Sequence, residues 1–201
     1  MRLAHAALLT LALAVIAPPA RALESSAKLT ESMRASGRAE VTLRYTLPAA
    51  PGGRARVVYG SLALEPPDRV RLDVPASGER IVAGHAGGAW LQPATRQLLR
   101  FGPRRAAPAL RWWRVLLGDG GAVRERRGGA GRWVLALADA AGVADSATVW
   151  LDGRGLPSRL QVGEGEEAVT YRLSGWRFPR ARGAKGFTLT APPGFETIDV
   201  P

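Results

Sequence analysis

The residue types that most often perform chemistry are scarce in this sequence. The 201 residues include no cysteine and two histidines, His5 and His85. Metal sites need clustered histidine, cysteine or carboxylate side chains, and an activated nucleophile needs a base beside it. His85 stands alone in a glycine-rich stretch, which indicates an exposed turn. The sequence therefore predicts a protein that is not an enzyme, with no catalytic residue, no metal site and no cofactor.

Two further patterns could suggest a polar site. The run Glu164-Gly165-Glu166-Glu167 holds three acids, but it lies between two segments with strand-like alternation. We interpret it as a solvated hairpin turn. The glycine-rich stretches 118–121 and 128–131 lack the strand–loop–helix context and the Lys-Ser/Thr ending of a phosphate-binding loop.

Large apolar side chains are the stronger signal, because six tryptophans accompany only three tyrosines. The tryptophans are Trp90, Trp112, Trp113, Trp133, Trp150 and Trp176. Each one alone favours a place in the core, but the group fits a pocket lined by large apolar side chains. Sheltering an acyl chain contributes about 0.8 kcal/mol per methylene, so about a dozen methylenes contribute on the order of 10 kcal/mol before entropic costs. Such a site needs no polar motif.

The first 22 residues have the order of a secretory signal peptide. Arg2 precedes a run of Ala, Leu, Val and Ile, and a proline pair and the small-x-small sequence Ala20-Arg21-Ala22 follow. The run is shorter than the roughly 20 residues that span a bilayer, although an uncleaved signal anchor is the alternative. We expect residues 1–22 to be removed and residues 23–201 to form a single periplasmic domain.

The positive charge is spread along the chain. The formal net charge is +11, and Lys28 and Lys185 are the only lysines. Nucleic-acid binding would concentrate the arginines between aromatic platforms, and this chain does not, so we expect no nucleic-acid partner. A generally cationic surface suits anionic membranes or acidic partners.

Most of the chain alternates with the period of a β-strand. In the segment 38–47 the odd positions are apolar and the even positions polar, as in a strand with one wet face. Turns rich in proline and glycine separate similar segments by roughly 8–12 residues, which predicts an antiparallel meander. The further expected strands are 55–65, 69–74, 80–83, 88–91, 97–101, 133–137, 147–151, 156–162, 169–174 and 187–189. The basic stretch 118–131 is expected to be a loop.

Two short helices interrupt this pattern. In the first, Ser25 or Ser26 provides a cap, Leu29 and Met33 lie one turn apart, and Gly37 ends the helix. The second covers 108–117 and is apolar over more than half of its circumference. About ten strands in one sheet would curl strongly, and two short helices leave the concave side incompletely filled. The predicted fold class is mainly β (α+β), a single curved antiparallel sheet with a hydrophobic cavity.

Motifs along the chain have the order found in a known family. The pattern "P…E…IV.DG..LW.Y.P...Q" is matched at Pro75, Glu79, Ile81, Val82, Gly87, Trp90, Pro93 and Gln97. The tail "FTLTAPPGFETID" matches the closing pattern "F.F.PP.G", in which the prolines and glycine end the last strand. With these motifs the chain resembles the periplasmic outer-membrane lipoprotein carriers (LolA), over essentially all of residues 23–201.

The resemblance implies an incomplete barrel in which two or three short helices form a lid over the cavity. It also implies a monomeric carrier that takes lipoproteins from an inner-membrane lipoprotein-releasing ABC transporter, shelters their acyl chains and passes them to an outer-membrane receptor. Two family positions differ here: Pro66 replaces an arginine that bonds the lid, and Val70 replaces an exposed phenylalanine that contacts the transporter.

The leading hypothesis is therefore a periplasmic carrier of lipoprotein acyl chains. The candidate cavity residues are Leu29, Met33, Leu62, Leu64, Val70, Leu72, Trp90, Leu98, Leu110, Trp113, Leu117, Trp133, Leu135 and Trp150. A one-residue slip in register would turn a strand's candidates to the other face. The alternatives are an accessory carrier for another amphiphile, and a periplasmic lipid-sensing or interaction module on the same fold.

Overall fold

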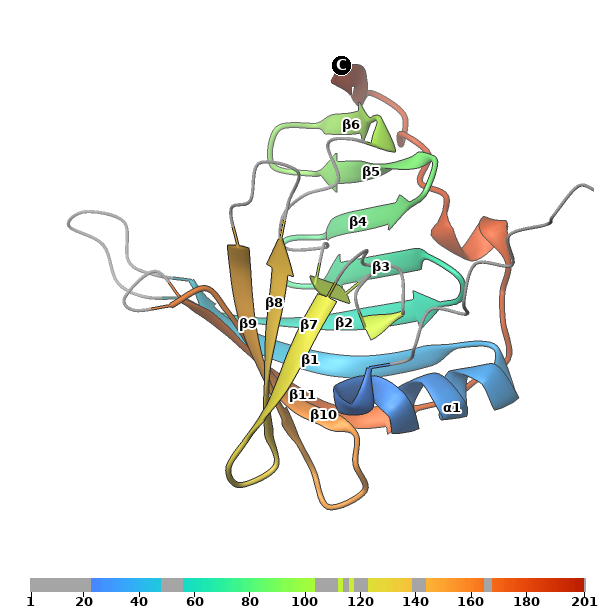
Figure 1. The fold of residues 1–201 in the computed structure, drawn as a ribbon. Helices are drawn as coiled ribbons and strands as arrows, with labels where there is room; N and C mark the ends of the chain where they lie inside the picture. Colours follow the sequence, from blue (N-terminus) through green and yellow to red (C-terminus); the bar gives the residue numbers. More distant parts are fainter. Residues whose placement is uncertain are drawn as a thin grey trace, which may run out of the picture.

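A computed structural model describes most of the chain. The described residues are 23–47, 56–103, 112–113, 116–117, 123–138, 144–164 and 168–200. They form one sheet of twelve strands and one α-helix, α1 (Ala27–Ser36), which a 3-10 turn at Glu24–Ser26 precedes (Figure 1). The strands are β1 (Ala39–Leu47), β2 (Arg56–Glu65), β3 (Arg69–Val74), β4 (Glu79–Gly84), β5 (Gly87–Gln92), β6 (Gln97–Phe101), β7 (Val123–Gly128), β8 (Arg132–Ala138), β9 (Ala144–Leu151), β10 (Pro157–Val162), β11 (Val169–Arg177) and β12 (Glu196–Val200).

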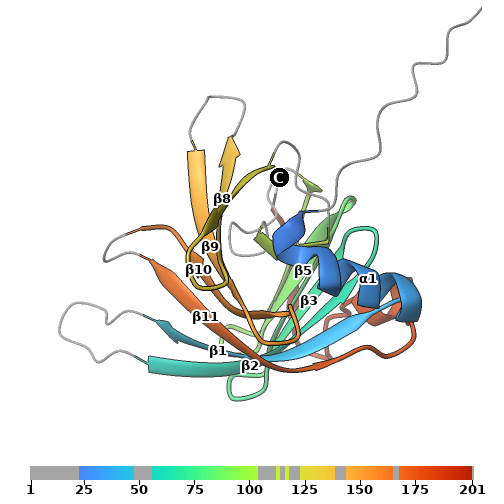
Figure 2. The same cartoon turned by 60° about the horizontal axis from the view of Figure 1, so that its bottom comes forward.

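The strand order is β12-β6-β5-β4-β3-β2-β1-β11-β10-β9-β8-β7. Neighbouring strands are antiparallel, except that β12 runs parallel to β6. The sheet curls around α1, and its edge strands β7 and β12 are not paired with each other (Figure 2). The predicted single curved sheet that does not close into a barrel is confirmed.

Helix α1 lies on the concave side of the sheet (Figure 2). Leu29 and Met33 are buried there, as their spacing of one helical turn predicts. The helix ends at Gly37, whose φ of 93° is a left-handed conformation that favours glycine. Its N–H donates to the carbonyl oxygen of Met33 at 2.6 Å. Within the described residues, no helix has the length and hydrophobicity that crossing a membrane requires.

The second predicted helix is described only at Trp112, Trp113, Leu116 and Leu117. The N–H of Leu117 donates to the carbonyl oxygen of Trp113 at 3.3 Å, which closes one helical turn. All four side chains are buried. Leu110 lies outside the described residues, as do the predicted signal peptide at 1–22 and residues 165–167 of the acidic run.

The stretch 118–131 was expected to be a loop, but it contains strand β7. The expectation is wrong because the inward positions of β7 are Val123, Glu125 and Arg127, which do not form an apolar face. Contacts with other elements stabilise them instead. The guanidinium of Arg127 lies 5.7 Å from the ring centroid of Trp133 on β8, and Glu125 binds the start of the helical segment.

The prediction of a last strand at 187–189 is also wrong. Phe187 ends a 3-10 turn (Ala184–Phe187), and Leu189 lies in irregular structure, where it packs against buried residues of β4–β6. The prolines and glycine at 192–194 precede the last strand, β12, instead of ending it. Alternation alone misled the prediction here, because the segment 187–189 pairs with no strand that the structure describes.

Candidate functional site

The strand register assigns each apolar side chain to one face of the sheet. Leu62 pairs with Leu72, and Leu72 pairs with Ile81, so the three side chains lie on the same face. They belong to, or pack against, the large buried cluster that contains Leu29 and Met33 of α1. This face is therefore the concave one.

Aromatic side chains fill the middle of the concave face. Trp113 meets Tyr171 edge-on with their ring centroids 5.2 Å apart, and Tyr171 lies 5.3 Å from Tyr45. Burial raises the pKa of Tyr171 to about 12, and the neighbouring Tyr45 acts in the same direction. Trp112 is also fully buried in this cluster. Trp112 and Trp113 thus pack against the concave face of the sheet.

A strip of large apolar side chains continues on the concave face beyond α1. Trp90 on β5 pairs with both Ile81 and Leu99, and Phe101 pairs with Gly88 of β5. We define Trp90, Leu99 and Phe101 as the β5–β6 strip. All three are half-buried, and none belongs to, or packs against, either buried cluster of the described residues. The indole Nε1 of Trp90 is buried and has no hydrogen-bond partner among the residues that the structure describes.

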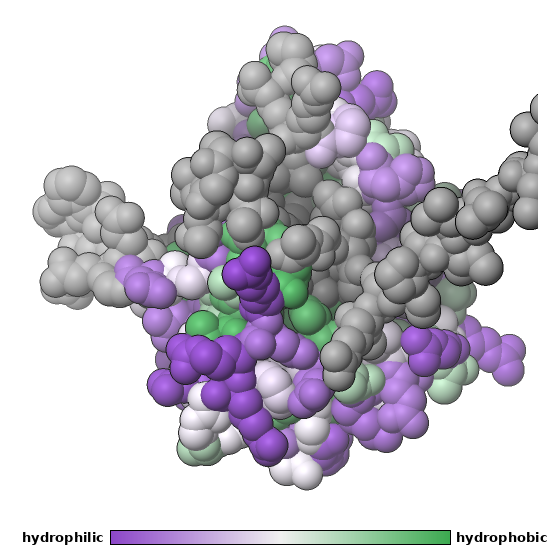
Figure 3. Space-filling model, in the orientation of Figure 1, coloured by the Kyte–Doolittle hydropathy of each residue, from purple (hydrophilic) through white to green (hydrophobic). Residues whose placement is uncertain are grey.

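Apolar residues reach the surface on this side of the molecule. In the orientation of Figure 1 they gather at the centre of the face, with hydrophilic residues below them (Figure 3). The described residues thus present an apolar surface here, and no cluster of three His, Cys, Asp or Glu side chains that could hold a metal ion occurs among them. Chemically this surface is suited to sheltering hydrocarbon.

Most of the sequence-predicted cavity residues lie on the concave face or on the elements that cover it. These are Leu29, Met33, Leu62, Leu64, Val70, Leu72, Trp90, Trp113, Leu117, Trp133 and Leu135. Trp90 and Trp133 are half-buried, whereas the others are buried.

Two predicted cavity residues lie on the outer face, and these assignments are corrected. Leu98 is fully buried in a second cluster with Val82, Ala89 and Leu91, which residues 189–195 cover. Trp150 points outward, and the guanidinium of Arg159 lies 3.5 Å from its ring centroid. Both errors are one-residue errors of register, which invert the face of a side chain.

The sequence interpretation missed Leu99, Phe101 and Tyr171. A signal for Leu99 was present, because the segment between β5 and β6 is a four-residue turn that sets Gln92 opposite Gln97. Counting two residues outward from that pair places Leu99 opposite Trp90. Tyr171 stands in the predicted strand 169–174, on the same face as Leu173.

The open edge of the sheet is tied to the start of α1. The carboxylate of Glu125 on β7 accepts hydrogen bonds from the backbone N–H of Glu24 at 2.5 Å and of Ser25 at 3.1 Å. A carboxylate is well placed there, since the first N–H groups of a helical segment lack partners and carry partial positive charge. Neither Ser25 nor Ser26 forms the predicted side-chain cap of α1.

His85 takes part in a polar contact between two turns. The imidazole is exposed, as predicted, and its Nδ1 lies 2.7 Å from the Oδ2 of buried Asp68, which also accepts the backbone N–H of His85. Among the residues that the structure describes, no three His, Cys, Asp or Glu side chains gather closely enough to hold a metal ion. The pair links the turn after β2 to the turn after β4.

Comparisons with known proteins support the architecture. No protein-family model matches the chain, and no curated protein sequence matches it. Solved structures do match. A LolA superfamily protein from Nitrosomonas europaea aligns with a TM-score of 0.54 and 14% identity, over 84% of this chain and 97% of that one.

Two further structures align over similar lengths. An uncharacterized conserved protein from Thermus thermophilus has a TM-score of 0.51 and 12% identity, and the match covers 88% of this chain and 98% of that one. A DUF1329 family protein from Desulfovibrio piger has a TM-score of 0.50 and 9% identity, with 82% and 95% covered. At such identities the likeness establishes the fold. The LolA-like resemblance is thus confirmed as a resemblance of fold.

Proposed function

We propose that this protein is a carrier that shelters acyl chains against the concave face of its sheet. The observation that supports this best is the β5–β6 strip of Trp90, Leu99 and Phe101. These side chains face the interior of the curved sheet, yet they are half-buried and lie outside both buried clusters. An acyl chain laid along the strip would cover apolar surface that the side chains of the described residues leave outside the buried clusters.

The energetics of such a complex do not require a polar motif. Each sheltered methylene contributes about 0.8 kcal/mol, so one long chain can outweigh the entropic cost of its immobilisation. The buried Nε1–H of Trp90 can donate one hydrogen bond to an ester or amide carbonyl oxygen of the cargo. Carriage of cargo in this way needs no catalytic group.

The covering elements are suited to opening. Helix α1 and the turn at 112–117 pack on the concave face through Leu29, Met33 and Trp113. Beyond this packing, the start of α1 is held by the two hydrogen bonds to Glu125. A cargo chain can enter by displacing these elements while the sheet keeps its own backbone hydrogen bonds.

At finer detail, we propose that the protein works in the periplasm and that its cargo is the acyl chains of lipoproteins. In this proposal it receives the lipoprotein from an inner-membrane ABC transporter and delivers it to an outer-membrane receptor. The signal-peptide pattern of residues 1–22 and the LolA-like fold support this version. Directional transfer then needs only a higher affinity at the acceptor.

One observation favours a second candidate, an accessory carrier for another amphiphile. Val70 is fully buried against the concave cluster, so it cannot take the part of an exposed phenylalanine in a transporter contact. Pro66 has no side-chain donor with which to bond a lid. A carrier of another amphiphile would need neither the exposed phenylalanine nor the arginine that bonds the lid.

The test is to purify the protein from periplasmic extract without detergent and to identify the bound lipid by mass spectrometry. Binding of a fluorescent fatty acid to delipidated protein gives the affinity. We expect Trp90→Ala to weaken binding about tenfold or more, because the variant removes both apolar contact and the donor. A lipoprotein acyl group in the extract supports the first candidate, and a different amphiphile supports the second.

Trp150→Ala is the matched control, since Trp150 is also a half-buried strand tryptophan but lies on the outer face. It should leave the affinity unchanged. Absence of any bound acyl chain, together with equal affinities for the two variants, would rule out the proposed function.

A further inference from the structure

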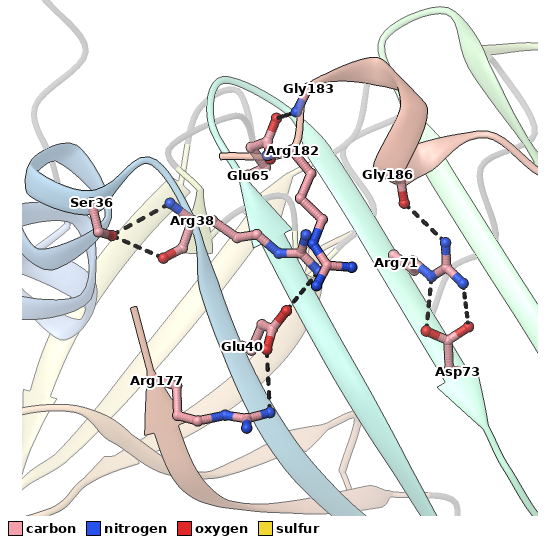
Figure 4. A network of polar contacts seen from close by, with 10 residues as sticks. All are labelled: Ser36, Arg38, Glu40, Glu65, Arg71, Asp73, Arg177, Arg182, Gly183 and Gly186. Carbon is pink, nitrogen blue, oxygen red and sulfur yellow. Dashed lines mark hydrogen bonds and ion pairs between the residues drawn. The ribbon is translucent and has the colours of Figure 1, made fainter. Parts of the chain in front are cut away.

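Four arginines converge on a pocket on the outer face of the sheet, away from the proposed acyl site. The pocket has a volume of about 210 Å³ and crosses β1, β2 and β3. Arg38, Arg71, Arg177 and Arg182 line it, with Glu40 and Asp73 as the lining carboxylates (Figure 4). Two positive charges therefore have no carboxylate within the lining to balance them.

Arg38 is the most unusual of the four. Its side chain is 5% exposed, and one guanidinium nitrogen, Nη2, lies 2.7 Å from Oε1 of Glu40. Its Nε and Nη1 are buried and have no hydrogen-bond partner. Burial lowers the pKa of Arg38, and the charges of Arg182 and Arg71 lower it further against the opposing effect of Glu40 and Glu65. A buried cation with unsatisfied donors is costly unless an anion accompanies it.

The nearby carboxylates are already engaged with other groups. Glu40 also pairs with Arg177 at 3.2 Å, and Asp73 holds Arg71 through two hydrogen bonds of 2.8 and 3.1 Å. Glu65 accepts the backbone N–H groups of Arg182 and Gly183. Its Oε1 also pairs with Arg69 at 2.8 Å. Within the described residues, none of these three carboxylates forms an ion pair with the Arg182 guanidinium.

Hydrogen bonds hold the backbone around the pocket in place. Glu65 holds the backbone at Arg182 and Gly183, and Arg71 donates to the carbonyl oxygen of Gly186 at 3.0 Å. These contacts anchor the segment that carries the Arg182 side chain over β1 and β2, beside Arg38 (Figure 4). The backbone that carries Arg182 therefore needs little ordering when a ligand binds, and it is the exposed Arg182 side chain that must be immobilised.

We propose that this pocket binds a phosphate group, with Arg38 and Arg182 as its principal ligands. Guanidinium forks match the oxygens of a phosphate, and charge-assisted hydrogen bonds of this kind are the stronger ones in proteins. One water needs about 10–15 Å³ of such a volume, so the pocket of about 210 Å³ has room for a phosphate and its first substituents. The phosphate belongs either to a phospholipid headgroup or to a free phosphate ion. The site lies on the opposite face from the acyl site and does not depend on that proposal.

The test uses the full protein after signal removal, in buffer without phosphate or sulfate. Calorimetric titration with inorganic phosphate tests binding of the free ion, and sedimentation with phosphatidylglycerol vesicles tests binding of a lipid headgroup. We expect one of these ligands to bind, and Arg182→Gln to weaken that binding about tenfold, because one charge-assisted contact is lost. Arg182 is exposed, and its guanidinium has no carboxylate partner among the described residues, so this variant should fold normally.

Arg172→Gln is the matched control, since Arg172 is an exposed arginine of β11 outside the pocket and its loss changes the net charge equally. Saturable phosphate binding that Arg182→Gln weakens and Arg172→Gln preserves supports a free-ion site. The same discrimination with vesicles alone supports a headgroup site. Absence of both, or equal losses in the two variants, overturns the proposal. Fatty-acid binding should be unchanged in both variants, which separates this test from that of the acyl site.

Discussion

The carboxylate of Glu125, on the edge strand β7, accepts the backbone N–H of Ser25, which lies 100 residues earlier in the chain. The neighbouring N–H of Glu24 donates to the other carboxylate oxygen. These two bonds join the unpaired edge of the sheet to the segment that leads into α1. Because α1 has no side-chain cap of its own, we infer that Glu125 sets how easily the helix leaves the concave face.

Replacing Glu125 should therefore loosen α1 without disturbing the sheet. In Glu125→Ala, one exposed and one partly buried N–H group lose a charged partner, and we expect the free energy of unfolding to fall by about 1–3 kcal/mol. Amide hydrogen exchange should accelerate across α1 more than across β1–β3. Glu31→Gln is the control, because Glu31 forms an exposed pair with Lys28 within the same helix. Equal exchange in the two variants would contradict the role of Glu125.

The elements that could be predicted are those whose local pattern agrees with their tertiary surroundings. Leu29, Met33 and Gly37 gave α1 its buried face and its end, and the alternation of 38–47 gave β1. Strand β7 could not be predicted in this way. Its inward positions include Glu125 and Arg127, whose partners, the N–H groups at the start of the helical segment and Trp133, become neighbours only after folding.

The candidate site was predictable in composition but not in register. The apolar surplus indicated a pocket, yet Leu98 and Leu99 are equally apolar, and only the pairing with β5 decides which of them faces inward. The same applies to Trp150, whose outward ring is covered by Arg159. The basic pocket had no sequence signal, because its arginines come from β3, β11, the residue that precedes β1 and the segment after β11.

Gly88 should be intolerant of a larger side chain because Phe101 occupies the space above it. A Cβ at Gly88 would lie 2.5 and 2.6 Å from the Cε2 and Cζ atoms of the Phe101 ring and would also clash with the carbonyl oxygen of Val82. Gly88→Ala should therefore displace the ring and lower the free energy of unfolding by about 1–3 kcal/mol in urea titrations. Gly153→Ala, in a turn where an added Cβ meets nothing within 4 Å, should change it little.

Tyr171 should make stability fall at high pH. Burial raises its pKa in the folded state to about 12 from the ordinary value of 10.0. The stabilisation that this shift gives the folded state is complete below pH 10 and is lost as the pH rises toward 12, because the phenol ionises first in the unfolded chain. The loss amounts to about 2–3 kcal/mol. Urea titrations from about pH 8 upward check this, with phenolate absorbance to follow ionisation. In Tyr171→Phe the fall in the free energy of unfolding should be smaller by about 2–3 kcal/mol. An equal fall in the two proteins would mean that other groups cause it.

Leu98 and Leu99 are adjacent in sequence and face opposite sides of the sheet, so they separate stability from cargo binding. Leu98 is fully buried beneath residues 189–195, and Leu98→Ala should cost about 2–5 kcal/mol through the cavity it creates. It should leave fatty-acid affinity unchanged in conditions where the protein stays folded. Leu99 is half-buried opposite Trp90, so Leu99→Ala should cost less stability and weaken fatty-acid binding severalfold. The two measurements are urea unfolding and titration with a fluorescent fatty acid. A reversed pattern would mean that cargo binds on the outer face, because the register leaves no third position for these side chains.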